Sequence, residues 1–387
     1  MQGLRKPHIV MLAGGSGIRQ IHLQLTRNAK ITRVVPVSDD GGSSKSIREH
    51  FHVLPVGDIR NALMTAAIAC PHGRAAVRLF NWRLPAQAPQ RDLVRQMQSM
   101  HEGEHSLVKK LQPAIRQAVK TYLAAFLRLS RGMSLQGGCI GNFILVGALK
   151  LHGDINTAIA ELGRAMLVDD SVWPVSVEHD LRLAATLDNG SHVIGQAKVT
   201  AIDRHLITNK IIKLTYLRSQ KIPVVNPKVV EAIADADLIV YGPGSFFTSI
   251  LPHVMVEGIV PAIAARHCRK VFIGNLVEGN ECFGYHLDEL LRYFIKTATL
   301  HAGGKLQRDG LLTDVIGNQC PAERSCTQSY LQPGRGLRRL ANNGVGINLQ
   351  DYEDPWHAGV HDAKLIGEEL WSMLGLGKSS MQHAEMS

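Results

Sequence analysis

The sequence predicts an α/β protein with a doubly wound, mainly parallel β-sheet, a helical insertion and a small antiparallel β segment. Three observations predict this class. In the N-terminal third, apolar runs alternate with amphipathic helical patterns, which is the β-α-β-α order of a parallel sheet. Helical patterns then follow one another at about 71–131. Finally, an Asp188-Asn189-Gly190 turn lies between short alternating runs, as in a β-hairpin.

The predicted elements follow one another with glycine-rich breaks between them. Residues 8–13 and 31–38 are predicted strands, and the helices that follow them are predicted at 18–27 and 59–69. A strongly apolar helix begins near Asn142.

Strand patterns return in the second half of the chain. Helix-then-strand order resumes at 226–245, and a buried strand begins at Arg269. A further strand is predicted within 310–318 and a closing helix within 363–376.

Composition limits the classes of protein to consider. The chain has 387 residues, of which 45% are hydrophobic and 20% charged, as in ordinary globular proteins. No apolar run approaches the ~20 residues that span a bilayer. The basic start and short apolar run before Gly14 read as a first strand, because no cleavage region follows. We therefore expect a cytoplasmic protein that does not enter a membrane.

The charge balance indicates an anionic ligand. The net charge is +10 and the pI is about 9.4, which suits a nucleotide or a phosphorylated metabolite. The Lys and Arg residues are dispersed and aromatics are only 5% of the chain, which argues against nucleic-acid binding. None of the 6 cysteines forms a Cys-x-x-Cys pair, so neither a zinc site nor a disulfide framework is expected.

Glycine-containing loops follow the predicted strands. They are Gly14-Gly15-Ser16-Gly17, Asp39-Asp40-Gly41-Gly42-Ser43-Ser44, Gly242-Pro243-Gly244-Ser245 and Gly274-Asn275. Parallel strands point their carboxyl ends to one edge of the sheet, where ligands bind. Glycine lets backbone N–H groups approach an oxyanion, and a helix N-terminus behind the loop adds further donors. The sequence therefore predicts a phosphate-binding pocket at this edge.

We expect the nucleotide or phosphate to be held by glycines, hydroxyls, amides and one arginine of these loops and of two helix starts. These residues are Gly14, Gly15, Ser16, Gly17, Gly41, Gly42, Ser43, Ser44, Arg60, Asn61, Asn142, Gly242, Gly244, Ser245, Thr248 and Asn275. Neither a dinucleotide fingerprint nor a P-loop is present, because Gln20 stands where a third glycine is needed and Lys45 follows a serine.

Three aspartates are candidate catalytic or metal-binding residues. Asp39 lies where an acid would accept a ribose hydroxyl, and Asp40 is placed to hold Mg²⁺ bridging phosphates. Asp39 is a second candidate metal ligand. The alternative is that one or both aspartates cap the helix that begins near Ser44. Asp58 is a candidate base and equally a candidate helix cap.

Taken together, the motifs resemble those of the CofD/YvcK family. They are "AGGSG", "VSDDGGSS", "LPVGDIRNAL", "GNFILVGAL", "ADLIVYGPGSFFTSILP" and "IGNLVEGNE", within residues 8–300. The resemblance implies a Rossmann-like nucleotide-binding core. One branch of the family comprises Mg²⁺-dependent 2-phospho-L-lactate transferases, and the other comprises gluconeogenesis factors that bind UDP-sugars without established catalysis.

The departures from these patterns leave both functions open. This chain has "GGCIGN" before the helix at Asn142 and "VEGNE" after the later strand, and both differ from the gluconeogenesis-factor pattern. It also lacks the threonine-proline-lysine of the transferase branch in its first loop. The expected function is Mg²⁺-assisted transfer of a phosphate-linked group, and the alternative is a non-catalytic regulator that acts through a protein partner. A homo-oligomer is the expected assembly.

The expected domains follow from this resemblance. A CofD-like nucleotide-binding domain is expected at 1–305 and a C-terminal extension that packs on the core at 306–375. A disordered tail is expected at 376–387. The base, the sugar and the acceptor are not specified by these residues.

Overall fold

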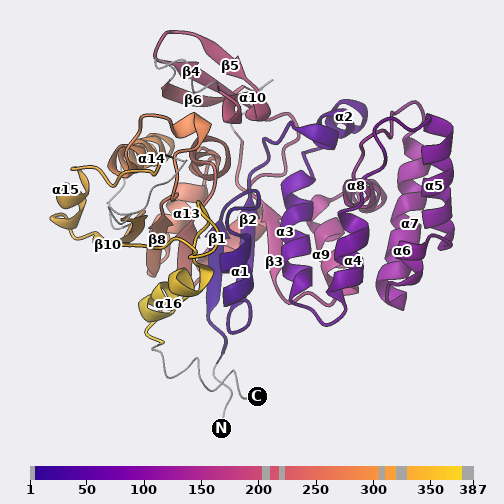
Figure 1. The fold of residues 1–387 in the computed structure, drawn as a ribbon, viewed down its shortest axis with the longest axis horizontal. Helices are drawn as coiled ribbons and strands as arrows, with labels where there is room; N and C mark the ends of the chain where they lie inside the picture. The colour runs from indigo at the N-terminus through magenta and orange to yellow at the C-terminus, as the bar shows by residue number, and fades with distance from the viewer. Residues whose placement is uncertain (1–4, 203–209, 218–222, 305–309, 320–328, 377–387) are drawn as a thin grey trace.

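Seven parallel strands form the main sheet of the computed structural model, which describes residues 5–202, 210–217, 223–304, 310–319 and 329–376. Their order is β10-β9-β8-β7-β1-β2-β3 (Figure 1). The strands are β1 (His8–Leu12), β2 (Lys30–Val35), β3 (Ser171–Pro174), β7 (Leu238–Tyr241), β8 (Arg269–Ile273), β9 (Asp314–Asn318) and β10 (Gly346–Gln350). The doubly wound, Rossmann-like α/β class is confirmed.

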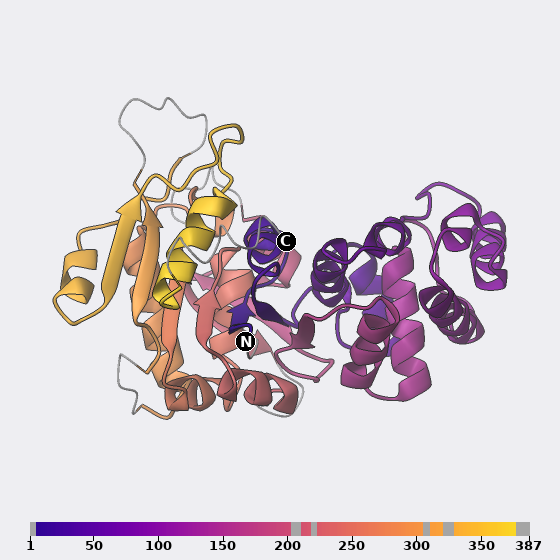
Figure 2. The same cartoon turned by 90° about the horizontal axis from the view of Figure 1, so that it is seen from below.

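Helices cover both faces of this sheet. Helices α1 (Arg19–Leu25) and α16 (Ala363–Met373) pack together on one face, and α11 (Pro227–Ala234) and α13 (Ile259–Ala265) pack together on the other (Figure 2). Every residue of β1, β7 and β9 is buried, which explains why β1 and β7 read as continuous apolar runs. Other helical segments of this half are η1 (Phe246–Ile250, a π-helix), α12 (Leu251–Val254), η2 (Asn280–Cys282, a 3₁₀-helix), α14 (Leu287–His301) and α15 (Leu337–Ala341).

A helical lobe lies beside the sheet and is coloured purple to magenta in Figure 2. It contains helices α4 to α7, where the insertion at 71–131 is expected, together with α8 and α9. Their bounds are α4 (Gly73–Phe80), α5 (Gln90–Glu102), α6 (Ser106–Lys109), α7 (Pro113–Leu129), α8 (Ile140–His152) and α9 (Ile155–Ala165). Phe126 of α7 stacks on Phe143 of α8 at a centroid distance of 4.4 Å. This contact joins the insertion to a helix that begins at the carboxyl edge of the sheet.

A small antiparallel sheet, in the order β5-β4-β6, lies above the carboxyl edge of the main sheet (Figure 1). Its strands are β4 (Arg182–Leu187), β5 (His192–Ile194) and β6 (Ile211–Leu217), and α10 (Gln196–Thr200) follows β5. Gly190 in the β4–β5 turn has a φ of +81°, which glycine adopts without a Cβ penalty. The predicted antiparallel segment is confirmed.

The segment after residue 305 is built into the main sheet. We expected it to pack on the core, but β9 and β10 extend the sheet beyond β8, with Gly346 in register with Asp314. The predicted tail lies outside the described residues from position 377 onward.

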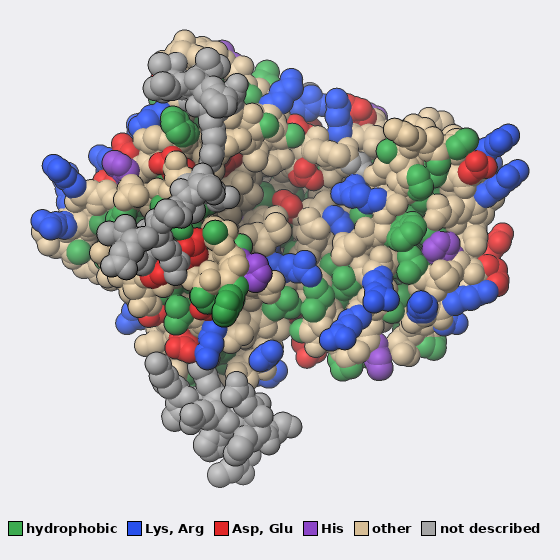
Figure 3. Space-filling model, viewed as in Figure 1, with side chains coloured by type: hydrophobic (Ala, Val, Ile, Leu, Met, Phe, Trp, Pro, Cys, Tyr) green, Lys and Arg blue, Asp and Glu red, His purple; other side chains and the backbone are tan. Residues whose placement is uncertain are grey.

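The surface gives two further observations. On the face drawn in Figure 3, Lys and Arg side chains are spread over the whole molecule rather than gathered in one patch. None of the described helices is both long and apolar enough to cross a bilayer.

Candidate functional site

The order of the strands places a crevice between β1 and β7. On one side of β1 the sheet continues with β2 and then β3. On the other side it continues with β7, β8, β9 and β10. Loops that follow neighbouring strands therefore diverge at this point, and ligands of open α/β sheets bind there. The first and third predicted loops follow β1 and β7 directly.

A cavity of about 450 Å³ opens at this crevice. Its walls come from the first three glycine loops, the starts of α3 (Gly57–Ile68) and α8, and α10 beside the small sheet. The lining residues are Gly14, Gly15, Ser16, Gly17, Asp39, Gly41, Gly42, Ser44, Gly57, Asp58, Arg60, Asn61, Arg83, Asn142, Gln196, Gly244, Ser245 and Ser249. Most of the residues predicted to hold phosphate are thus brought together.

Three helices begin at this cavity without a side-chain cap. They are α2 (Gly42–Phe51, 10 residues), α3 (12 residues) and α8 (13 residues). No side chain of their N-cap residues Gly41, Val56 and Cys139 accepts a backbone hydrogen bond. Their positive dipole ends and first-turn N–H groups converge on one space. Such an arrangement favours an anion.

The first loop rests on a buried arginine that sequence reasoning missed. Arg33 of β2 is fully buried, and its guanidinium donates to Ala13 O at 3.2 Å and to Gly15 O at 3.0 Å. Burial lowers the pKa of Arg33 to about 10, so it remains a cation at neutral pH. Arg33 therefore fixes the loop and places a positive charge beneath it.

Asp58 lies against the same loop. Its Oδ1 accepts a hydrogen bond of 3.2 Å from the N–H of Gly15. Burial, followed by the negative charge of Asp39, raises the pKa of Asp58 to about 6. A carboxyl group with this pKa can take up a proton near neutral pH.

Asp39 braces the second loop and also faces the cavity. Its Oδ1 accepts from the N–H of Gly41 at 3.0 Å, and its Oδ2 accepts from the hydroxyl of Ser44 at 2.7 Å. A Cβ on Gly57 would come within 2.5 Å of Asp39 Oδ2, so glycine lets the start of α3 approach this carboxylate. The side chain of Ser43 lies outside what the structure describes.

The carboxylate of Asp40 faces α10 and not the predicted phosphate-binding cavity. It does not line the cavity; its Oδ2 and Oδ1 accept hydrogen bonds from the backbone N–H groups of Gln196 at 3.1 Å and Ala197 at 2.8 Å. It caps α10 rather than the helix near Ser44. In the described structure, Asp40 is a positioning residue that ties the second loop to the small sheet.

Arg60 supplies a buried cation to the cavity wall. Its Nη1 donates to Asn81 Oδ1 at 2.6 Å, whereas its Nε is buried and has no hydrogen-bond partner in the described residues. Burial lowers the pKa of Arg60. Gly141 allows the side chain to pass, because a Cβ there would lie 2.7 Å from Arg60 Cδ. Arg83, a second arginine on the wall, was not predicted.

The third loop is held from behind by Asn275. The amide of Asn275 accepts from the N–H of Gly244 at 3.1 Å and donates to Gly244 O at 3.0 Å. Gly244 and Ser245 line the cavity, but Gly242 and Asn275 do not. Thr248 does not either: it is buried, and its hydroxyl donates to Glu281 Oε2 at 3.0 Å.

The predictions missed several contributors. Gly57, Arg83 and Gln196 line the cavity. One weak signal existed, because Gly57 directly precedes Asp58 at the start of α3. Nothing local marks Arg83 or Gln196, because the helical lobe and the small sheet bring them to the cavity.

The donor set suits a hard cation. Among the described residues, no group of three His, Cys, Asp or Glu side chains forms a metal cluster. However, Asp39 and Asp58 line one cavity, and the charge of Asp39 contributes to the raised pKa of Asp58. Mg²⁺ needs only one or two carboxylates when phosphate oxygens and water complete its shell. These two carboxylates fit it, whereas those of Asp39 and Asp40 do not share the cavity.

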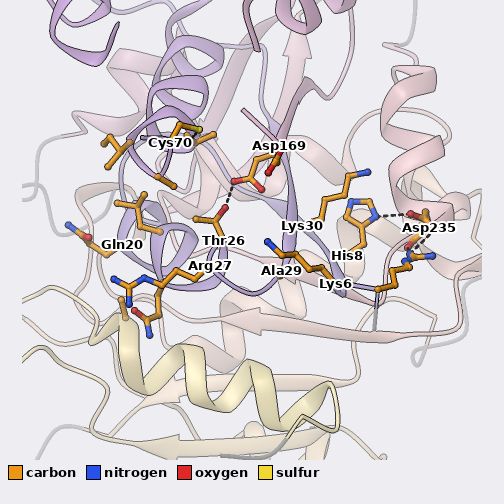
Figure 4. A pocket seen from close by; sticks show the side chains of 18 residues that line it. Lys6, His8, Gln20, Thr26, Arg27, Ala29, Lys30, Cys70, Asp169 and Asp235 are labelled. Carbon is orange, nitrogen blue, oxygen red and sulfur yellow. Dashed lines mark hydrogen bonds and ion pairs between the residues drawn. The ribbon is translucent and has the colours of Figure 1, made fainter. Parts of the chain in front are cut away.

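A larger cavity, of about 1270 Å³, lies at the opposite edge of the sheet (Figure 4). Arg5 and His8 of this cavity both contact Asp235, at 3.0 and 3.3 Å. Its basic residues Arg5, Lys6, Arg27 and Lys30 lie among the acids Asp169, Asp170 and Asp235, and the C-terminal ends of α1 and α3 also line it. Helix C-termini disfavour anions, and the described lining of this cavity contains no glycine loop, unlike that of the first cavity.

Comparisons with known proteins agree with the fold of the chain. The family model described as 2-phospho-L-lactate transferase CofD matches residues 9–345. A protein of Listeria monocytogenes named "Gluconeogenesis factor" is 29% identical over 373 residues, which cover 95% of this chain and 96% of that protein. A Thermotoga maritima protein named for the same factor is 30% identical over 292 residues, 74% of each chain. A crystal structure of a UPF0052-family protein from Bacillus halodurans has a TM-score of 0.69, with 24% identity over 95% of this chain and 99% of that chain.

Proposed function

The chain belongs to the CofD family, and from this premise we propose that the cavity between β1 and β7 binds the diphosphate of a nucleotide or nucleotide-sugar and supports Mg²⁺-assisted transfer of a phosphate-linked group. The observation that carries the proposal is the convergence of three uncapped helix N-termini on one glycine-lined cavity. The cytoplasmic location expected from the sequence is part of this proposal.

The phosphates are held by backbone and by cations. The glycines of the first three loops allow close approach of N–H groups, and the helix starts add positive dipole ends. Arg60 is buried, has an unpartnered Nε and has no carboxylate within ion-pair distance in the described residues. We assign it to a non-bridging phosphate oxygen. Arg83, at the cavity mouth, contributes a more exposed charge.

Asp39 and Asp58 would hold Mg²⁺ together with phosphate oxygens. The ion supplies charge neutralisation at the phosphorus that is attacked. This assignment replaces the Asp39–Asp40 pair that the sequence favoured. It also explains why two acids share a cavity built for an anion.

The transfer needs a proton acceptor, and Asp58 is placed for this role. An acceptor hydroxyl attacks phosphorus and forms a new P–O bond, while the bond from phosphorus to the bridging oxygen of the nucleotide breaks. The hydroxyl proton passes to the carboxylate of Asp58, and a nucleoside monophosphate leaves with the bridging oxygen and its electron pair.

The second candidate is a non-catalytic regulator. It is favoured by the Listeria relative, which matches nearly the full length of both chains and is named a gluconeogenesis factor. The same cavity would then bind a nucleotide-sugar without turning it over, and a protein partner would respond to the bound state.

Calorimetry with a nucleotide panel tests the binding site. The panel holds GTP, GDP, GMP, UDP-N-acetylglucosamine, UDP-glucose, ATP and NAD, each with and without Mg²⁺. We expect diphosphate-containing ligands to bind more tightly with Mg²⁺, and Asp39→Asn and Asp58→Asn to remove most of that dependence. Absence of binding across the panel, or unchanged metal dependence in both variants, would overturn the proposal. Turnover of the best ligand with candidate acceptors then separates the transferase from the regulator.

A further inference from the structure

The loop at residues 351–362, between β10 and α16, presents a tryptophan to solvent. Trp356 is 86% exposed, and Val360 on the same loop is 43% exposed. The loop lies beyond residue 345, where the match to the family model ends. A single exposed apolar side chain is common on protein surfaces, so the setting of Trp356 decides its meaning.

Hydrogen bonds within the loop hold its tip in place. A carboxylate oxygen of Asp354 accepts from the N–H of Trp356 at 2.9 Å and lies 2.9 Å from His357 Nδ1. The backbone N–H of Asp354 donates to Val360 O at 2.8 Å, which closes the loop. A side chain carried by a fixed loop loses less conformational freedom when a partner binds it. Trp356 is therefore presented in a form suited to recognition.

This loop is acidic, although the protein as a whole is basic. Residues 351–362 contain neither Lys nor Arg, and the chain has a net charge of +10. The acids of the loop are Asp351, Glu353, Asp354 and Asp362. An acidic projection on a basic protein is attracted to the basic surface of another copy of the same chain.

A groove of about 500 Å³ between α14 and α15 has the complementary character. Its basic side chains are Arg292, Lys296 and Arg339, and Ile295 and Leu340 supply its apolar part. Neither Lys296 nor Arg339 forms an ion pair with a described residue. The groove can therefore accept an apolar group that is accompanied by negative charge.

An aromatic ring suits this groove better than an aliphatic one. Guanidinium groups stack on the face of an indole, and Trp and Arg are the residues that most often dominate the binding energy of protein interfaces. Arg339 lies on the rim beside two more exposed arginines of the same segment, Arg335 and Arg338. These cations would face the acids of an incoming loop.

The loop and the groove lie at opposite ends of β10. Helix α15 ends at Ala341, before this strand, and the loop begins directly after it. A strand of 5 residues spans roughly 17 Å, and no residue of the loop lines the groove of its own chain. Helix α15 lies at the outer margin of the molecule, where a second copy can approach (Figure 1). A two-fold axis near β10 would exchange the two ends of the strand and close the assembly at two copies.

We propose that two copies of this chain associate through these surfaces, with Trp356 of each copy seated in the α14–α15 groove of the other. The acids of each loop then face Lys296 and Arg339 of the other copy. This gives the homo-oligomer expected from the sequence a defined surface, away from the cavity between β1 and β7. The inference does not rest on the proposed function.

Sedimentation equilibrium of the full chain over a series of protein and salt concentrations tests the proposal. We expect a dimer whose Kd rises as salt is raised, because part of the contact is electrostatic. Trp356→Ala and Arg339→Glu should each raise the dimer Kd by about 100-fold or more, since each contact occurs twice. The matched controls are Trp82→Ala and Arg128→Glu, which change an indole and a cation exposed on the helical lobe and should leave the Kd unchanged.

A mixture of the two variants separates this contact from a general loss of structure. In a mixed dimer, the intact loop of the Arg339→Glu copy meets the intact groove of the Trp356→Ala copy, so one of the two contacts is restored. We expect the mixture to dimerise more tightly than either variant alone. A monomeric wild type, a Kd unchanged in both variants, or no recovery in the mixture would overturn the proposal. The first of these outcomes would leave the groove to a small molecule or to a different protein.

Discussion

Asp40 and Gln196, which are 156 positions apart in the sequence, are joined by a hydrogen bond of 3.1 Å from the N–H of Gln196 to Asp40 Oδ2. The neighbouring carboxylate, that of Asp39, lines the cavity instead. Two adjacent aspartates thus have different partners. Asp39 faces the ligand space between β1 and β7, and Asp40 holds α10, whose Gln196 lines the same cavity.

Because the two aspartates have different partners, we expect substitution of Asp40 to change stability and substitution of Asp39 to change ligand affinity. Asp40→Asn replaces one acceptor oxygen with a donor that faces a backbone N–H, so we expect it to lower the free energy of unfolding by about 1 kcal/mol. Asp39→Asn should instead lower Mg²⁺-dependent nucleotide affinity by about tenfold. Urea unfolding and calorimetry of both variants measure the two effects. Greater loss of metal dependence in Asp40→Asn than in Asp39→Asn would contradict our assignment.

Arg60 should carry much of the phosphate affinity. Hydrogen bonds to charged groups contribute about 1.5–3 kcal/mol, so Arg60→Met should weaken GDP or UDP binding by roughly 10- to 100-fold. Stability should change little, because removal of a buried cation also removes its desolvation cost. Arg83→Met is the control on the same wall. Its effect should be smaller and should fade as salt is raised, since Arg83 is exposed.

Asp58 should make stability depend on pH. Its pKa is about 6 in the folded protein against an ordinary value of 3.8, so between about pH 4 and pH 6 the folded state binds more protons than the unfolded state. This residue's contribution to stability therefore falls as pH rises through that window. Asp58→Asn lacks the effect, so its stability relative to wild type should increase by on the order of 2 kcal/mol from pH 4 to pH 7. Urea unfolding without Mg²⁺ at a series of pH values measures the difference, and a constant difference would exclude the raised pKa.

The close approach at Gly57 can be tested with one methyl group. A Cβ at Gly57 would lie 2.5 Å from Asp39 Oδ2 and 2.9 Å from Ser44 Oγ, so Gly57→Ala must displace the second loop. We expect at least tenfold weaker diphosphate binding, since the displaced carboxylate is a proposed metal ligand. Gly163→Ala in α9 is the control, because a Cβ there would meet no atom within 4 Å and Gly163 does not line the cavity. Equal losses in the two variants would argue against a steric cause.

The sequence was sufficient to locate the cavity because its signals are local. Glycines directly after apolar runs mark the ends of parallel strands, and the topology of such a sheet brings those ends together. For the same reason, the third loop could be assigned to the site although it follows the first by more than 200 positions.

Other features depend on distant partners and have no local signal. Arg33 reads as an exposed strand residue, and its burial is possible only because Ala13 and Gly15 offer carbonyls. Asp39 and Asp40 could not be distinguished, since α10 is the partner that decides their directions. Strand β10 was missed because its residues are half-buried or exposed and lack the apolar run of the central strands.

The pairing of β1 with β7 has a consequence for biosynthesis. His8 begins β1, and its backbone N–H donates to Asp237, 229 positions later. Strand β1 is the first strand to leave the ribosome, but it cannot pair with β7 until most of the chain has been made. The helices between these two strands can complete their local contacts earlier. The ligand crevice lies at this late junction. A nascent chain can thus acquire its helical lobe well before it can bind a nucleotide.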